Sequence, residues 1–370
     1  MTAVVVVFWL ALAALAWTHV VYPLFAMLLA RVATKPIAAL HNTPSVAVIV
    51  AAHNEEPVIQ GRVANLRALD YPPDKLEIVV TSDASTDRTE ELAAAAGAGV
   101  IRNPRGGKVA AQGHAVRETD SEIVAFSDAN ATWAPDALRK LVAPFADPDI
   151  GYVCGQLRLQ APDGANKEGL YWRYELAVRE AESRLGSITG GNGAIYAVRR
   201  SDYVEVDPRF GHDLSLPYRM VQRGKRAVYV PQALAYEKPT PSNETEYRRK
   251  VRMFEHCWLI VAHGGMLRRI GPLYALQVLS HRHLRYASGL LHIVLLGTSI
   301  VLVTRGWPYQ AALAVQVALL AAAAVGVGVA RYYTLVTWAT VASLANYLRR
   351  GVPATWDVTR GAAQGRRASA

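Results

Sequence analysis

The chain has 370 residues, of which 52% are hydrophobic, and its formal net charge is +10 at pH 7. Much of the positive charge lies beside long apolar stretches, so lipid head groups explain it better than nucleic acid, which we do not expect as a partner. The two cysteines lack metal-ligand spacing and form no disulfide framework, which is typical of a protein in a reducing cytosol.

Residues 1–35 predict an amino-terminal transmembrane anchor. Val4–Ala30 is almost wholly apolar, is long enough to span a bilayer, and is followed by Arg31 and Lys35. No charged region follows Met1 and no convincing cleavage site is present, so we expect the anchor to remain uncleaved. The positive-inside rule then places the amino terminus outside and the following domain in the cytosol.

Residues 44–260 predict a cytosolic α/β domain with a mostly parallel sheet. Apolar runs alternate with amphipathic helices, which is the pattern of βαβ units. The first four predicted strands are Val46–Ala51, Leu76–Val80, Val100–Arg102 and Ile123–Phe126. The first, second and fourth end in turns rich in carboxylates and amides. Since the carboxyl ends of parallel strands meet at one edge of a sheet, these turns are expected to lie together.

The rest of this domain predicts a mixture of elements. Strands are expected at Tyr152–Leu159, Ala194–Val198 and Val228–Val230, and helices at Asn166–Leu185, Gly211–Arg223 and Glu246–Trp258.

Residues 261–286 predict interfacial helices, and residues 287–350 predict carboxy-terminal membrane segments. His and Arg scattered among Leu and Tyr in Leu273–Tyr286 suit a helix that lies in the membrane interface. Ala287–Thr304 and Ala311–Ala330 are apolar enough to span a bilayer.

The last apolar segment, Tyr332–Leu348, ends in Arg349 and Arg350. If it crossed the membrane, its basic end would lie outside, against the positive-inside bias. We therefore expect three crossings, with this segment interfacial or re-entrant, and residues 351–370 as a cytosolic tail.

The stretch Glu122–Asp136 predicts a metal site. Its apolar run ends in Asp128, and Asn130 follows one residue later. Mg²⁺ takes one or two protein oxygens and lets substrate phosphates and water fill its other positions. Asp128 and Asn130 are therefore candidate ligands of Mg²⁺ or Mn²⁺. An Asx turn that ends the strand is the alternative explanation.

Three motifs in order resemble the membrane-bound family-2 glycosyltransferases that make polysaccharides, which are related to cellulose, chitin, hyaluronan and poly-N-acetylglucosamine synthases. The motifs are AAHNEE at 51–56, SDASTD at 82–87 and Asp128-Ala129-Asn130. The resemblance covers about residues 44–260 and also fits the flanking apolar segments. It implies a glycosyltransferase A-type fold, a UDP-sugar donor and a divalent cation.

The resemblance also implies donor-nucleotide-binding residues, namely Ala52, Asn54, Glu55, Asp83, Lys108 and Asp128. Glu55 and Asp83 follow adjacent strands and can accept hydrogen bonds from a base and a ribose. Compensation of helix dipoles by acidic residues is the alternative. Gly106 and Gly107 precede Lys108 at a helix start, where backbone N–H groups favour a phosphate. A solvated surface turn is the alternative there.

Gly211-His212-Asp213 stands at the position of the family's Glu-Asp motif, with His212 in place of Glu. The resemblance implies that Asp213 is the general base that deprotonates the acceptor hydroxyl. A helix N-cap is the alternative. We expect Gly191, Asn192 and His212 to bind the acceptor, and a plain hairpin turn is the alternative for the glycine-rich loop.

Arg248–Met253 lies where processive relatives carry Gln-x-x-Arg-Trp, and only Arg252 matches. Arg252 is expected to act catalytically by pairing with the diphosphate. A basic helix on lipid head groups is the alternative. Met253 replaces the tryptophan that would stack on the acceptor sugar, which argues against a processive enzyme.

The sequence therefore predicts a multi-pass glycosyltransferase of the cell (inner) membrane with a cytosolic catalytic domain. It would move one sugar, with inversion, from a UDP-sugar to a lipid-linked or growing glycan acceptor, in the synthesis of a cell-surface polysaccharide. Alternatives within this class are a processive synthase of the cellulose, chitin or hyaluronan type and a polyprenol-phosphate sugar synthase. A catalytically inactive membrane scaffold is the alternative outside it.

Overall fold

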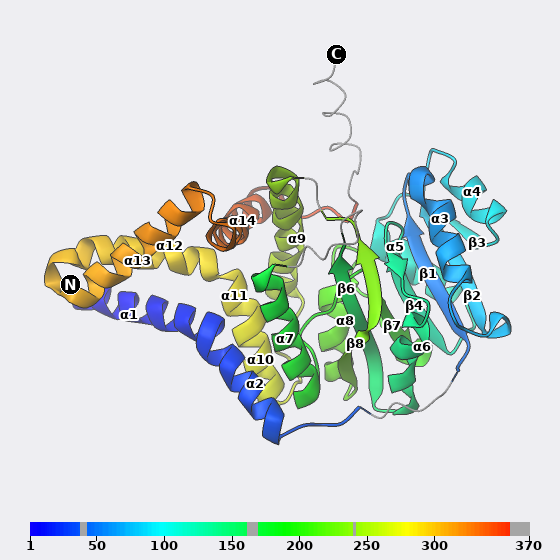
Figure 1. Ribbon diagram of the computed structural model, residues 1–370, viewed down its shortest axis with the longest axis horizontal. Coiled ribbons are helices and arrows are strands. Elements are labelled where there is room, and N and C mark those ends of the chain that lie inside the picture. The colour runs from blue at the N-terminus through cyan, green and yellow to red at the C-terminus, as the bar shows by residue number, and fades with distance from the viewer. Residues whose placement is uncertain (38–42, 161–168, 240–241, 356–370) are drawn as a thin grey trace, which may run out of the picture. The chain divides into compact units, whose positions relative to one another are not determined.

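The computed structural model describes residues 1–37, 43–160, 169–239 and 242–355 (Figure 1). The chain folds into two units that are interleaved along the sequence. The helical unit comprises Met1–Val32, Glu168–Ala181 and Thr240–Val352, and the α/β unit comprises Ala33–Lys167, Glu182–Pro239 and Pro353–Ala370. Most of the expected tail, from residue 356 onward, lies outside the described residues.

The described part of the α/β unit contains an eight-stranded sheet in the order β3-β2-β1-β4-β7-β6-β8-β5. Its strands are β1 (Val46–Ala52), β2 (Leu76–Asp83), β3 (Gly99–Asn103), β4 (Ile123–Asp128), β5 (Thr132–Trp133), β6 (Ile150–Leu159), β7 (Tyr196–Arg199) and β8 (Arg226–Glu237). The pairs β3–β2, β2–β1 and β1–β4 are parallel, as predicted. Strand β7 runs antiparallel to both β4 and β6, β6 pairs in parallel with β8, and β5 pairs antiparallel with β8.

The register of the parallel half brings the predicted site residues to one edge of the sheet. Ala51 of β1 lies opposite Asp128 of β4, and Ala52 lies opposite Ser82 of β2. Strands β2 and β4 are longer than predicted and end at Asp83 and Asp128 themselves. The sheet ladder uses backbone groups, so polar side chains can continue a strand that the apolar run alone would end early.

Helices α3 (Glu56–Arg67), α4 (Thr89–Ala95), α5 (Lys108–Arg117), α6 (Ala137–Val142) and α8 (His212–Gln222) complete the α/β unit, and α7 (Leu170–Leu185) is divided between the two units. The first part of the predicted helix Asn166–Leu185, up to residue 168, lies outside the described residues.

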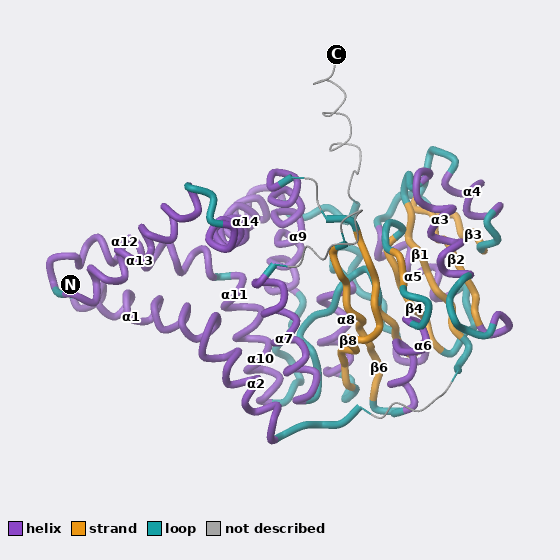
Figure 2. Tube along the Cα trace, viewed as in Figure 1, coloured by secondary structure: helices purple, strands orange, loops and turns teal. Residues whose placement is uncertain are grey.

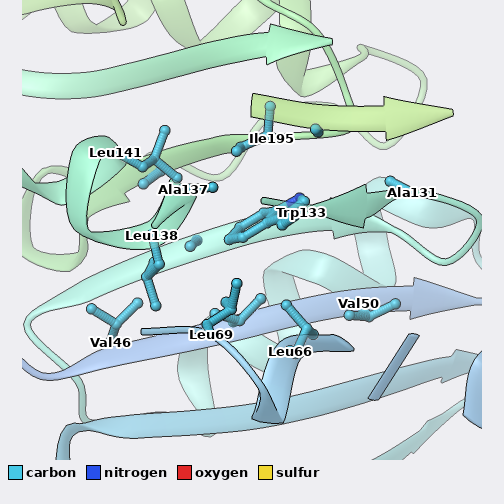
Figure 3. Packing of buried hydrophobic residues seen from close by; sticks show 14 of the residues in the cluster. Val46, Val50, Leu66, Leu69, Ala131, Trp133, Ala137, Leu138, Leu141 and Ile195 are labelled. Carbon is cyan, nitrogen blue, oxygen red and sulfur yellow. The ribbon is translucent and has the colours of Figure 1, made fainter. Parts of the chain in front are cut away.

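The core of the α/β unit lies between the sheet and its helices, as Figure 3 shows for Val46, Leu66, Trp133 and Leu138. All four side chains are at most 1% exposed. Helix α3 contributes Leu66 from an apolar stripe at helical spacing, which explains why this amphipathic segment packs on the sheet.

The helical unit consists of helices and loops in its described residues (Figure 2). They are α1 (Thr2–Ala16), a π-helical turn (Trp17–Val21), α2 (Tyr22–Val32), α9 (Asn243–His263), α10 (Pro272–Val278), a second π-helical turn (Leu279–His283), α11 (Leu284–Tyr286), α12 (Ser288–Leu302), α13 (Trp307–Ala324) and α14 (Gly328–Arg350).

Three described helical segments are long and apolar enough to cross a membrane: Thr2–Val32, Ser288–Arg305 and Trp307–Ala324. By length and composition they agree with the three predicted crossings. The predicted third span, Ala311–Ala330, begins and ends later than the helix α13 (Trp307–Ala324). Helix α13 ends earlier than predicted because a turn at Gly326 separates it from α14. The expected interfacial helix Leu273–Tyr286 is interrupted by the second π-helical turn.

Candidate active site

The turns after β1 and β2 are joined by Asn54. Its backbone N–H donates to Ser85 Oγ at 3.2 Å, and its side-chain oxygen accepts from the N–H of Thr86 at 2.8 Å. Asn54 and Ala84 both have positive φ, 57° and 55°, and Asn is one of the few non-glycine residues that tolerate this region. The Asn54 side chain therefore holds the two turns together. Ala52, another predicted donor-binding residue, ends β1 and is buried.

Glu55 is the N-cap of α3 and lies in the turn that follows β1. Burial, with further repulsion from Asp128 and Asp87, raises the pKa of Glu55 to about 7. The carboxyl of Glu55 therefore shares an acidic neighbourhood with Asp128, although the two residues are far apart in sequence.

Asp83 shapes the loop that precedes α5. Its side chain is buried and accepts hydrogen bonds from the N–H groups of Gly106 at 2.7 Å and Gly107 at 3.0 Å. Arg105 Nη1 pairs with its other oxygen at 2.5 Å. Both carboxylate oxygens are engaged by this loop, so Asp83 couples the end of β2 to the proposed phosphate loop.

Lys108, the first residue of α5, forms an ion pair with Asp128 at the end of β4. The glycine-rich loop lies against this pair: a Cβ added at Gly193 would be 3.1 Å from Asp128 Oδ2 and 3.2 Å from Lys108 Nζ. A side chain at position 193 would fill the space beside the ion pair, which explains a glycine there.

Four carboxylates, those of Glu55, Asp128, Asp213 and Glu237, interact electrostatically with Lys108. Burial alone would lower the pKa of Lys108, but Asp128, Asp213 and Glu237 raise it overall. Glu55 also interacts with both Lys108 and Asp128. The structure thus brings together Glu55, Lys108, Asp128 and Asp213, which come from the ends of β1 and β4 and the starts of α5 and α8.

The predicted metal ligands are unequal in their surroundings. The Asp128 side chain is 32% exposed and pairs with Lys108, whereas Asn130 is exposed beyond β4. Within the described ranges, no group of three or more His, Cys, Asp or Glu could hold a metal ion by itself. Two oxygens from Asp128 and Asn130 nevertheless fit a hard cation that takes its other ligands from phosphates and water.

His212, predicted to bind the acceptor, lies in the core at the start of α8. It is 3% exposed, its Nδ1 is 3.0 Å from the Tyr196 hydroxyl, and its ring meets Phe126 edge-on. Burial, with a smaller effect of Lys108, lowers the pKa of His212 to about 3. These contacts anchor the start of α8, and binding of the acceptor by His212 stays a prediction.

Asn192, also predicted to bind the acceptor, is hydrogen-bonded within the fold. Its side-chain nitrogen donates to the Gly155 carbonyl at 2.7 Å and to Cys154 Sγ at 3.2 Å. Its oxygen accepts from the N–H groups of Ala194 and Ile195, both at 3.0 Å. These four contacts use the hydrogen-bonding positions of the amide, so Asn192 braces the loop, and its contact with an acceptor stays a prediction.

Gly191 connects the glycine-rich loop to α8. Its N–H donates to the Asp213 carbonyl at 2.6 Å, and a Cβ added there would be 2.2 Å from the Tyr152 hydroxyl. The glycine therefore permits a close approach of the loop to the residue predicted to be the general base.

Arg252 lies on α9 in the helical unit and is exposed. Its predicted role at the diphosphate stays a prediction.

Two residues at this edge of the sheet were not predicted. Glu237 ends β8 as Asp128 ends β4, so a carboxylate at the end of an apolar strand was the available signal. Arg62 is 2% exposed, donates to Ser127 Oγ at 2.7 Å and lies 5.1 Å from the Trp133 ring centroid. An arginine on the otherwise apolar face of α3, between Ile59 and Leu66, was the sequence signal for this residue.

The strand order and the flanking helices form a GT-A-like fold, with carboxylates at one edge of its sheet. Residues 47–206 match the model of Glycosyl transferase family 2, so this part of the chain is a family-2 glycosyltransferase domain, and the protein is a glycosyltransferase. This confirms the predicted fold and enzyme class.

Known proteins agree with this class. An N-acetylglucosaminyltransferase of Rhizobium meliloti (strain 1021) is 28% identical over 309 residues, which cover 72% of this chain and 70% of that protein. Another, from Sinorhizobium fredii (strain NBRC 101917 / NGR234), is 30% identical over 55% of each chain, so only about half of that relative is spanned. The mannosyltransferase PcManGT from Pyrobaculum calidifontis, solved with GDP-Man and Mn²⁺, has 25% identity and a TM-score of 0.72 over 93% of this chain and 99% of its own.

Proposed function

We propose that this enzyme transfers one sugar, with inversion, from a UDP-sugar to a lipid-linked or growing glycan acceptor at the cytosolic face of the cell membrane, in the synthesis of a cell-surface polysaccharide. The observation that carries the proposal is the convergence of Glu55, Asp128 and Asp213 on Lys108 at the carboxyl edge of the parallel strands. Ligands of open α/β sheets bind at this edge.

Asp128 and Asn130 are the residues that would hold Mg²⁺ or Mn²⁺ in this proposal. The bound cation would supply positive charge that stabilises the departing diphosphate. Lys108 begins α5, so its ammonium and the start of this helix favour the donor phosphates, while the N–H groups of Gly106 and Gly107 donate to Asp83. Arg252 would provide a further cation for the diphosphate.

Asp213 is the proposed general base. Its carboxylate would accept the proton of the acceptor hydroxyl as that oxygen attacks the anomeric carbon from the face opposite the diphosphate. The start of α8 is fixed by His212 inside the core and by the bond between Gly191 and the Asp213 carbonyl. A base held in this way keeps its orientation toward the acceptor.

The named relatives guide the choice of donor. Two of them are N-acetylglucosaminyltransferases, which makes UDP-N-acetylglucosamine the first donor to test. PcManGT was solved with GDP-Man, so GDP-mannose is the second. The three candidate spans support an acceptor that reaches the enzyme from the membrane.

The test uses the full chain purified in detergent, with Mn²⁺, each donor and a membrane-lipid extract as the acceptor source. The wild type should release nucleoside diphosphate and add a single sugar. Asp213→Asn should bind UDP as the wild type does and lose transfer. Asp120→Asn is the matched control, since Asp120 is fully exposed and far from the strand ends that carry the site.

Other outcomes would favour the alternatives. A long polymer from one donor indicates a processive synthase, and a product formed on polyprenyl phosphate alone indicates a polyprenol-phosphate sugar synthase. Unchanged transfer in Asp213→Asn would contradict the role of this residue. Absence of turnover with every donor in the wild type would favour an inactive scaffold.

A further inference from the structure

The ion pair between Lys108 and Asp128 involves the carboxylate that is the proposed metal ligand. Lys108 Nζ pairs with Asp128 Oδ1, and the two side chains are 21% and 32% exposed. The backbone of the glycine-rich loop closes one side of the pair, since a Cβ at Gly193 would be within 3.2 Å of both charged groups. The ammonium therefore lies at a carboxylate oxygen that a divalent cation needs.

The charges around this pair favour a cation. Asp128, Asp213 and Glu237 all act on Lys108, and Glu55 interacts with both members of the pair. The cations near these four carboxylates are the Lys108 ammonium and the Arg62 guanidinium, which also interacts with Asp128, so carboxylates outnumber cations in this region. Lys108 offsets part of this excess when no other cation is present, and a second cation at the same oxygen would be repelled by the ammonium.

The lysine side chain can leave Asp128 without a change of fold. It is a single charge on a flexible four-carbon stem, and it begins α5 directly after Gly106 and Gly107. A diphosphate at this helix start would offer the ammonium a new anionic partner. When the ammonium turns to the phosphates, both oxygens of Asp128 become available to a metal ion.

We propose that Lys108 competes with the divalent cation for Asp128, so that the cation binds weakly until a nucleoside diphosphate draws the lysine away. This inference rests on the proposed function, which places both the cation and the donor diphosphate at this edge. Because coupling free energies are reciprocal, the cation then strengthens nucleotide binding by the factor by which the nucleotide strengthens cation binding.

The test measures Mn²⁺ binding by the full chain in detergent, from the electron paramagnetic resonance signal of free Mn²⁺, with and without UDP. We expect UDP to tighten Mn²⁺ binding to the wild type by about tenfold, within the usual range of coupling between sites. Lys108→Met should bind Mn²⁺ alone about tenfold more tightly than the wild type and should show a smaller effect of UDP. Lys108→Arg keeps the positive charge and should bind Mn²⁺ alone as weakly as the wild type.

Two controls complete the design. Lys140→Met removes a surface lysine that pairs with Asp136 and should behave as the wild type. Asp128→Asn should weaken Mn²⁺ binding with and without Lys108. Circular dichroism shows whether each variant is folded, and Lys108→Gln replaces Lys108→Met if the latter is not.

The outcomes separate the two proposals. If UDP and Mn²⁺ bind the wild type but Lys108→Met binds Mn²⁺ alone no more tightly, the competition is wrong and the proposed function stands. If no form binds Mn²⁺ even with saturating UDP, the metal-dependent function and the competition both fail.

Discussion

Glu55 makes the stability of this protein dependent on pH near neutrality. Its pKa is raised from 4.5 to about 7 by burial and by the nearby Asp128 and Asp87. Between these two values the folded state retains a proton that the unfolded state has lost. The free energy of unfolding therefore falls as the pH rises from about 4.5 to 7.

Glu55→Gln should remove this dependence. We expect the melting temperature of the wild type to fall relative to that of the variant between pH 5 and pH 8, measured in metal-free buffer. Glu91→Gln is the control, because the exposed pair with Arg88 lowers the pKa of Glu91 and moves its titration below this range. Parallel curves for the wild type and Glu55→Gln would show that Glu55 has an ordinary pKa.

Gly107 occupies a backbone conformation that other residues rarely adopt. Its φ is +92°, and a Cβ added there would be 2.1 Å from the Ala354 carbonyl oxygen. The N–H of Gly107 also donates to Asp83. A substitution at this position therefore strains the loop and pushes away the chain around residue 354.

Gly107→Ala should lower the free energy of unfolding by about 2 kcal/mol, the cost typical of a strained backbone position, and should weaken UDP binding. Gly61→Ala is the matched control, because Gly61 is an exposed helical residue with nothing near its Cβ position. Alanine there should raise stability by about 0.5–1 kcal/mol. Denaturant unfolding and UDP titration measure both effects, and equal behaviour of the two variants would contradict the argument.

At the level of elements, α8 contains Pro217 in its interior. In a regular helix the N–H of residue 217 would donate to the carbonyl of residue 213, and proline has no N–H. The Asp213 carbonyl is left without this partner, and the N–H of Gly191 donates to it at 2.6 Å. A proline that costs helix stability thus allows α8 to hold the glycine-rich loop beside the proposed base.

Pro217→Ala supplies the missing N–H and sets it in competition with Gly191. We expect transfer to fall by about tenfold as the loop loosens, while the melting temperature stays within a few degrees of the wild type. Pro308→Ala is the control, since Pro308 lies in the first turn of α13, where an N–H has no helical partner. Unchanged transfer with a lower melting temperature would indicate that Pro217 serves packing alone.

The elements themselves were largely predictable. Buried parallel strands are continuous apolar runs, so β1, β2 and β4 were located from their apolar residues. Strand β8 was predicted as Val228–Val230 but extends over Arg226–Glu237, because pairing with β6 carries the ladder across Pro231 with a shift in register. The residues of β8 alone do not reveal that it pairs with β6.

The positions of the candidate site residues were easier to predict for carboxylates at strand ends than for residue types that serve equally well in a site or in the core. Carboxylates at strand ends pointed to Glu55 and Asp128. His212 and Asn192 can serve either a ligand or the core, and their partners, Tyr196 and Gly155, come from other strands. Which use applies depends on tertiary contacts that spacing along the chain does not reveal.

At the scale of the whole molecule, the α/β unit is interrupted in sequence by a segment of the helical unit, whereas the sequence predicted one continuous domain over 44–260. Within the helical unit, Glu175 of α7 pairs with Arg285 at 2.8 Å and with His281 at 3.0 Å. The ion pair with Arg285 and the contact with His281 fix α7 to the segment around the second π-helical turn. Truncation at a single boundary would therefore remove part of one unit.

The proposed arrangement of the chain across a membrane rests on the three candidate spans and the charges beside them. Arg31 lies at the end of Thr2–Val32 and Lys35 follows it, and the other two spans meet at a short turn formed by Arg305 and Gly306. If the α/β unit is cytosolic, this turn lies outside the cell membrane. The native Cys154 and Cys257 are buried, so they contribute little background to cysteine labelling.

Single cysteines should therefore label on opposite sides. We expect Arg305→Cys to react with a membrane-impermeant maleimide in intact cells of a bacterial expression host. Glu91→Cys, in the α/β unit, is exposed and should react only after the cells are permeabilised. Both positions should react fully in detergent, which controls for accessibility. Labelling of Glu91→Cys in intact cells would place the α/β unit outside, where no supply of nucleotide sugar is expected, and would contradict the proposed membrane topology.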